Sequence, residues 1–418
     1  MNKNVENFNK VKLISVFPFL SVMLFFPSIT FGIYSAEIFP WAFIISLLYI
    51  KSYNKYFLLL ILVLFFSFLF TFSSLNNSFI FFEGVRSLGA YYNSLFAFAF
   101  VICLNNLRIF KIIKISKFIF GLLLILGIIQ FFGIIQFLDP LFKFIIPSSS
   151  ASVLLEINRG VNLLSIEPAR AGNELIFLYI LFRLVFIKRN KIIYDILFAC
   201  YLLIIIQSAM VILFYSIFVL LYYRLKLLYP ALILILILPF IKFDFIGGGR
   251  AIDLFNELYL LENYDDIFFT LINTSGHRLI SIYSSFLYGL TYPFGGGIGN
   301  WMISSVEALK MTGFDLSSLN YFKLFGNNFA VGIRSSGFVS NLILDIGWLG
   351  ISFFIFYLYK SLKDYWNLNN ESRTIILLFL TKIFFIGAVG HPLAWIITVV
   401  CLRYIYLNSI KETTFVHE

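Results

Sequence analysis

Apolar runs follow one another along almost the whole chain, and most charged residues fall in the short stretches between them. A helix of about 16 to 22 apolar residues is long enough to cross a hydrocarbon core about 30 Å thick. The pattern therefore predicts an all-α, polytopic integral membrane protein with about 12 transmembrane helices. We expect these helices at residues 11–30, 34–50, 56–72, 91–104, 118–137, 175–187, 192–206, 211–223, 227–241, 338–359, 374–388 and 392–406.

Two longer polar stretches divide the chain. Residues 1–242 hold the first nine predicted helices and a loop at 139–174, and residues 243–337 form the longest stretch without a plain apolar run. Residues 338–418 hold the last three predicted helices and a C-terminal tail.

Composition supports this assignment and excludes a soluble globule. Hydrophobic residues make up 61% of the 418 positions and charged residues only 12%, whereas soluble domains have about 45–50% and about 25%. The net charge of +10 comes from basic residues in short loops rather than on one soluble face, so we expect no nucleic-acid partner. Lys and Arg accumulate in cytoplasmic loops of membrane proteins. Their distribution predicts that both termini are cytoplasmic and that both long loops face outward.

Few residues suggest a metal or redox site. The three cysteines, Cys103, Cys200 and Cys401, each fall in a predicted helix, and their spacing predicts neither a disulfide nor a metal site. We expect no cofactor.

The basic residues on the predicted outer face are exceptions to the charge rule. They are Arg86, Lys143, Arg159, Arg170, Lys242, Arg250, Arg278, Lys310, Lys323 and Arg334. The guanidinium group donates paired hydrogen bonds to phosphate oxygens and stays charged at any working pH. Five arginines are therefore candidates for binding a phosphate-linked substrate: Arg159, Arg170, Arg250, Arg278 and Arg334. The alternative for each is a lipid-headgroup anchor or a surface ion pair, and that alternative weighs most for Arg250 and Arg334.

A reaction on the outer face has no nucleotide available and must use an already activated group, such as a lipid-linked sugar pyrophosphate. Transfer of a sugar needs a group that accepts the proton of the attacking hydroxyl. Glu167, which lies before Pro168, and His277, which lies beside Arg278, are the candidates. Glu167 is equally suited to orienting Arg159 or Arg170 as an ion-pair partner.

We interpret the other polar features as structural. The glycine clusters at 247–249 and 295–299 could bind phosphate through backbone amides, but tight turns are the favoured interpretation. Asp345 and Lys382 lie at comparable depths in predicted helices, so we expect them to form an ion pair. His391 is interpreted as a turn residue at the outer break between the last two helices.

Three stretches resemble the Wzy-type O-antigen and capsular polysaccharide polymerases, in the superfamily of O-antigen ligases and polymerases. They are R-G-V-N-L-L-S-I-E-P-A-R-A-G from Arg159, Arg278 followed by ten residues and Gly289, and S-G-F-V-S-N-L-I-L-D-I-G-W-L-G from Ser336. The spacing after Arg159 is two residues longer than the paired motif of the family. Ser336 stands where ligases place a histidine, which favours a polymerase over a ligase.

The resemblance implies a GT-C-like membrane fold and a metal-independent glycosyltransferase of the bacterial inner membrane. It would join oligosaccharide repeat units carried on undecaprenyl pyrophosphate. Arg159, Arg170 and Arg278 would hold pyrophosphate, and Glu167 or His277 would assist the acceptor hydroxyl. A chain-length regulator, a flippase and membrane lipids would be its expected partners. Two alternatives stay open, an O-antigen ligase and a lipid-linked oligosaccharide flippase or other transporter.

Overall fold

The computed structural model describes residues 52–75, 78–133, 168–223, 278–314, 332–386 and 389–415, with isolated positions between these ranges. The predicted helices at 11–30 and 227–241, and nearly all of 34–50, lie outside the described residues.

Every regular element in this part of the chain is a helix. Five helices are long and apolar enough to cross a membrane: Lys55–Ser73, Phe81–Ile102, Asn106–Phe131, Phe338–Trp366 and Leu393–Ile410. The main elements are α3 (Lys55–Leu75), α4 (Ser78–Ile102), α5 (Asn106–Phe131), α8 (Pro168–Phe186), α9 (Lys191–Tyr201), α10 (Ala209–Tyr223), α14 (Arg278–Thr291), α15 (Trp301–Met311), α17 (Phe338–Trp366), α18 (Asn370–Phe385) and α19 (Leu393–Phe415). A helical membrane protein is thus confirmed.

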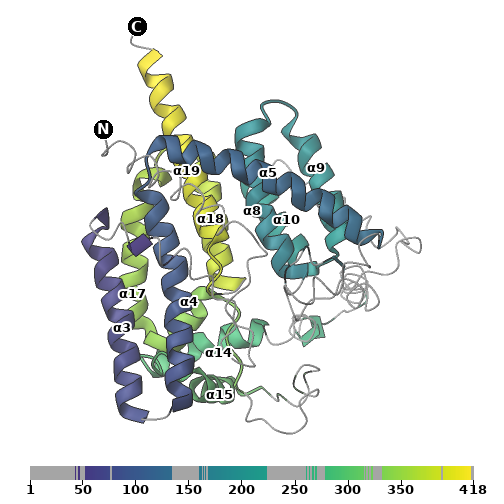
Figure 1. The fold of residues 1–418 in the computed structure, drawn as a ribbon. Coiled ribbons are helices and arrows are strands. Elements are labelled where there is room, and N and C mark those ends of the chain that lie inside the picture. The colour runs from purple at the N-terminus through teal and green to yellow at the C-terminus, as the bar shows by residue number, and fades with distance from the viewer. Residues whose placement is uncertain are drawn as a thin grey trace.

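The helices form two groups joined by α18 and α19 (Figure 1). Helices α3, α4 and α17 run side by side, and the short helices α14 and α15 pack across one of their ends. We call this the α15 end, and the opposite end, from which α19 projects, the C-terminal end. Helices α8, α9 and α10 form the second group. Large aromatic side chains, among them Phe98, Phe379 and Trp395, fill the core between α4, α18 and α19.

Several helix boundaries differ from the predicted ones because polar residues are satisfied inside helices. Helix α4 begins at Ser78, so Glu83 and Arg86 lie in a helix and not in the predicted loop. Their side chains form an i,i+3 ion pair, which lowers the cost of carrying charge in an apolar helix. Helix α5 begins at Asn106, twelve residues early, because Asn105 caps it by accepting a hydrogen bond from Arg108 N.

The glycine cluster at 295–299 forms a tight turn that fits into a kink of α17. Gly347 has φ 64° and ψ −175°, and the kink frees backbone groups that a straight helix would pair. Gly296 N and Gly297 N donate to the carbonyls of Leu344 and Asp345, both at 2.8 Å, and Leu349 N donates to Pro293 O at 3.1 Å. The amides of Gly296 and Gly297 are therefore occupied by backbone carbonyls, as the turn interpretation of this cluster predicts.

The break between α18 and α19 lies deep in the bundle. Asn93 donates to Gly390 O at 2.8 Å and Ser94 to Val389 O at 2.5 Å. Ser94 lies about 12 Å along α4 from its last residue, Ile102, at about 1.5 Å per residue. The predicted outer position of this break is therefore wrong, because the break contacts the middle of α4.

Candidate functional site

Among the described residues, two of the basic residues predicted for the outer face, Arg86 and Arg334, lie near each other at the α15 end. One face of α4 carries Glu83, Arg86 and Ser87, because residues three and four apart share a face. Arg334 approaches from the segment before α17, and Trp301 is the first residue of α15. We call these five residues the arginine cluster.

Contacts within the arginine cluster are specific. Arg86 Nη1 donates to Glu83 Oε1 at 3.1 Å, and Trp301 Nε1 donates to Glu83 Oε2 at 3.0 Å. Arg334 Nη2 donates to Ser87 Oγ. The guanidinium carbon of Arg334 lies 5.7 Å from the centre of the Trp301 ring, within the range of a cation–π contact. Glu83 therefore orients Arg86 and Trp301, and Trp301 orients Arg334.

The two arginines retain donor capacity. The buried Nε atoms of Arg86 and Arg334 find no partner among the residues that the structure describes. Leaving a buried donor unpaired costs about 1–3 kcal/mol, and the cost is higher when the donor belongs to a charged group. Two guanidinium groups with unused donors are therefore suited to an anion with several oxygen atoms.

A buried carboxylate adjoins the arginine cluster. Tyr91 donates to Asp345 Oδ2 at 2.7 Å, and the side chain of Arg334 is close enough to act electrostatically on Asp345. Asp345 Oδ1 is buried and has no partner in the described part of the chain. Asp345 thus adds a buried proton acceptor near Arg334.

No family model, curated protein or solved structure matches this chain.

The predicted site residues are only partly placed. Arg159, Glu167, Arg250 and His277 lie outside the described residues. The structure places the other three arginines in separate elements: Arg170 in the first turn of α8, Arg278 at the first position of α14, and Arg334 before α17. Of these three, Arg334 belongs to the arginine cluster.

The spacing between Arg278 and Gly289 has a packing explanation. Eleven residues make about three turns of helix, so both lie on one face of α14. A Cβ atom on Gly289 would lie 2.4 Å from Ile343 Cγ2 and 3.0 Å from Trp348. Gly289 therefore allows α14 to pack closely against α17, and this packing fixes the position of Arg278.

At the α15 end, Tyr292 and Glu307 form a polar pair near the protein surface. Tyr292 donates a hydrogen bond to Glu307 Oε1 at 3.1 Å. This hydrogen bond and the negative charge of Glu307 raise the pKa of Tyr292 above its ordinary value. The pair joins the end of α14 to α15.

A second polar cluster lies at mid-bundle and contradicts the predicted Asp345–Lys382 pair. Lys382 Nζ lies 2.6 Å from Glu174 Oε1, and His391 Nδ1 lies 3.3 Å from the same oxygen. Both Glu174 Oε2 and Asn173 Oδ1 are buried without a described partner. Lys382 pairs with Glu174 because the break after α18 brings it against α8, while Asp345 faces Tyr91. We call Asn173, Glu174, Lys382 and His391 the mid-bundle cluster.

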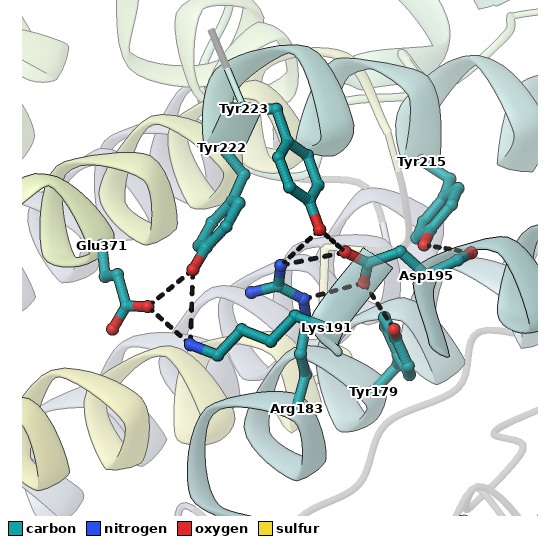
Figure 2. A network of polar contacts seen from close by, with 8 residues as sticks. All are labelled: Tyr179, Arg183, Lys191, Asp195, Tyr215, Tyr222, Tyr223 and Glu371. Carbon is teal, nitrogen blue, oxygen red and sulfur yellow. Dashed lines mark hydrogen bonds and ion pairs between the residues drawn. The ribbon is translucent and has the colours of Figure 1, made fainter. Parts of the chain in front are cut away.

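A third network stabilises the C-terminal end of the second helix group (Figure 2). Arg183 binds Asp195 through two hydrogen bonds, from Nε to Oδ1 at 2.7 Å and from Nη2 to Oδ2 at 2.9 Å. Tyr179 donates to Asp195 Oδ1 at 2.5 Å, and Tyr223 donates to Oδ2. The Arg183 guanidinium also lies 3.7 Å from the centre of the Tyr222 ring. Both carboxylate oxygens of Asp195 and the Nε and Nη2 atoms of Arg183 have partners, so we interpret the Arg183–Asp195 clamp as structural.

The clamp continues to α18. Lys191 Nζ lies 2.9 Å from Glu371 Oε1, and Tyr222 donates to the same oxygen at 2.7 Å (Figure 2). Burial tends to raise the pKa of Glu371, but the hydrogen bonds from Tyr222 and Lys191 outweigh it and lower that pKa. These contacts tie α9 and α10 to α18.

Sequence reasoning missed several of these residues. Arg86 carried a signal, since it is a basic residue on the predicted outer face. Glu174, Arg183 and Asp195 carried another, because each lies in or at the edge of an apolar run, where charge is costly. Their partners are 12 to more than 200 residues away in sequence, so no local pattern could identify them. Among the described residues, no group of three or more His, Cys, Asp and Glu side chains could hold a metal ion.

Proposed function

We propose that this protein is a polysaccharide polymerase of the bacterial inner membrane, a glycosyltransferase that joins lipid-linked oligosaccharide repeat units on the outer face. The α15 end would face outward. The donor would be a glycan linked to undecaprenyl pyrophosphate, and the acceptor would be the sugar end of an incoming lipid-linked repeat unit.

The arginine cluster is the single observation that carries this proposal. It brings two guanidinium groups with unused donors to one end of α4, where Arg86 lies about 7.5 Å along the helix from Phe81 at about 1.5 Å per residue. The pyrophosphate of a membrane-anchored lipid would reach this level just inside the end of the apolar span. Arg86 and Arg334 would bind its oxygen atoms and stabilise the charge that develops as it leaves.

The proposed step is a substitution at the anomeric carbon of the donor. The acceptor hydroxyl oxygen forms a bond to this carbon, while the bond from the carbon to the pyrophosphate oxygen breaks and its electron pair leaves with the pyrophosphate. The hydroxyl proton passes to a carboxylate or a histidine. Asp345 Oδ1, near Arg334, is a candidate acceptor in the described part of the chain, and Glu167 and His277 remain candidates.

Complementation of a deletion strain tests the role of the arginines. Arg334→Gln and Arg278→Ala should abolish polymer while protein level and membrane insertion persist. Arg189→Gln removes an exposed arginine at the opposite end of the bundle and is the matched control, with polymer retained. Normal polymer length in the Arg334 variant would remove the arginine cluster from the mechanism.

The mid-bundle cluster favours a second candidate, a transporter of lipid-linked oligosaccharide. Transporters place ionisable groups near the middle of the membrane, beside interrupted helices, and Glu174, Lys382 and His391 meet at the break between α18 and α19. A transport role predicts that Glu174→Gln blocks movement of lipid-linked repeat units to the outer leaflet. A polymerase predicts that unpolymerised units still reach the cell surface in that variant.

A further inference from the structure

A cavity of about 520 Å³ opens at the C-terminal end of the bundle, between α3, α4, α17 and α19. It is separate from the arginine cluster, because none of the residues of that cluster line it. Its charged lining residues are Lys360, Asp364 and Arg403. Tyrosines form much of the remaining wall: Tyr53, Tyr357, Tyr365 and Tyr406.

The depth of this cavity matches the headgroup region of a bilayer. The apolar span Phe81–Ile102 of α4 is about 33 Å long at about 1.5 Å per residue. The cavity lies at the C-terminal end of this span, where Ile102 and Cys103 line it. A hydrocarbon core is about 30 Å thick. If Phe81 marks one boundary of the core, the cavity lies at the other, where lipid phosphates are found.

The charges in the cavity are arranged for a ligand that carries both signs. Lys360 and Asp364 lie one turn apart on α17, and both are exposed. They form no ion pair with each other or with any other charged side chain that the structure describes. Lys placed before an acidic residue at i,i+4 is the weaker orientation for pairing. Lys360 Nζ contacts the Phe356 ring, 5.5 Å from its centre, and apart from this contact both groups are available to a ligand.

Arg403 supplies a second cation that is held in place. Its Nη atoms donate to the carbonyls of Ile102 and Leu104 at 3.3 and 3.0 Å, and to Asn106 Oδ1 at 3.0 Å. These bonds provide donors for backbone carbonyl groups at the C-terminal end of α4. The buried Arg403 Nε has no described partner.

We infer that this cavity binds the headgroup of a zwitterionic phospholipid, a phosphodiester that carries a primary amine. The phosphate lies between Lys360 and Arg403, and the ammonium group lies at Asp364 and against the tyrosine rings, which attract cations. Two methylene groups separate phosphate from ammonium in phosphoethanolamine, which suits charges one helical turn apart. This inference is independent of the proposed function, because it uses none of the residues in the arginine cluster.

Lipid binding to the purified full chain in detergent tests the inference by native mass spectrometry. Phosphatidylethanolamine should bind as a discrete adduct at least tenfold more tightly than phosphatidylglycerol, which has the phosphate but no amine. Equal binding of the two lipids, or a preference for phosphatidylglycerol, would overturn the assignment of Asp364 to the amine. Displacement of the lipid by millimolar inorganic phosphate would show that the cavity binds free phosphate and not a lipid headgroup.

Variants locate the site. Lys360→Gln and Asp364→Asn should each weaken phosphatidylethanolamine binding about tenfold or more, the effect of losing one charged hydrogen bond. Lys363→Gln removes an exposed lysine of the same helix that does not line the cavity, and it should bind as the wild type does. Equal loss in all three variants, or no loss in the first two, would place the lipid elsewhere.

Discussion

At the scale of single residues, orientation distinguishes the arginine cluster from an ordinary set of surface charges. Glu83 uses both carboxylate oxygens, one for Arg86 and one for Trp301. Trp301 in turn lies beside Arg334. The two guanidinium groups are thus fixed before any ligand arrives, which reduces the entropy cost of binding an anion.

Arg334→Lys tests whether the fork of the guanidinium matters beyond its charge. Lysine keeps the positive charge but loses the Nε donor and the planar contact with Trp301. Polymer formation in membranes should fall about 10-fold to 100-fold, which corresponds to about 1.5–3 kcal/mol for one charged hydrogen bond. The rate of repeat-unit incorporation, at equal protein level, measures this effect. An unchanged rate would mean that Arg334 contributes only charge.

Lys382→Met tests the mid-bundle cluster. Removing one partner of a buried ion pair leaves an uncompensated charge and costs about 3–5 kcal/mol. The melting temperature of the purified protein should fall strongly. The double variant Glu174→Gln and Lys382→Met leaves no charge unpaired, and it should recover most of the loss. A double variant as unstable as the single one would show that the Glu174–Lys382 pair is not the source of the effect.

At the scale of elements, the kink of α17 and the glycine turn depend on each other. The turn supplies donors to carbonyls that the kink frees, and Pro293 O accepts from Leu349 N. A Cβ atom on Gly347 would lie 2.1 Å from Pro293 O, and one on Gly297 would lie 2.0 Å from Thr71 Oγ1. The kink holds Asp345 beside Tyr91, so the fit of this turn positions the candidate proton acceptor.

Gly347→Ala should destabilise the protein by more than the 1–3 kcal/mol that a strained backbone conformation alone costs. Gly313→Ala provides a control for strain, because Gly313 has φ 70° but open space around its Cβ position. Gly121→Ala provides a control for the substitution itself, because this glycine has open space around it in α5, and alanine should be neutral or slightly stabilising there. The order of the melting temperatures of the three variants separates the steric clash from backbone strain and from the substitution itself. A Gly347 variant as stable as the Gly313 variant would mean that the turn yields to the added carbon.

Helices were predicted well wherever an apolar run determines them. The predicted ranges 56–72, 192–206 and 211–223 correspond to α3, to α9 with the short π-helix that follows it, and to α10. The range 338–359 was predicted as one helix, but α17 is interrupted at Gly347. Prediction failed where charged residues continue a helix, as at Glu83 and Arg86 in α4. It failed again at Lys382, because the depth of the α18–α19 break depends on packing against α4 and α8.

Part of the candidate site was predictable for the same reason. Arg334 and Arg278 stand out as basic residues where the charge rule expects few. Arg86 carried this signal too, but its role depends on Glu83, Trp301 and Arg334 meeting in space. Glu83 and Trp301 are 218 residues apart, and no sequence pattern reports such a contact.

At the scale of the whole molecule, the proposed polymerase function requires the α15 end to face outward. Basic residues at the C-terminal end, among them Lys188, Lys191 and Lys363, would then lie on the cytoplasmic side, as the charge rule expects. In a variant without Cys103, Cys200 and Cys401, Lys310→Cys should react with a membrane-impermeant maleimide in spheroplasts. Lys188→Cys should react only after lysis. The opposite pattern would place the arginine cluster in the cytoplasm and remove the basis of the proposed reaction.

Deletion of the gene in its native host, followed by gel analysis of the surface polysaccharide, tests the central claim most directly. The account predicts loss of the polymer ladder, with single repeat units still attached to their carrier, and recovery by the wild-type gene but not by the Arg334→Gln variant. Loss of all attached glycan with accumulation of lipid-linked polymer would indicate a ligase instead. An unchanged ladder would contradict both and favour the transporter.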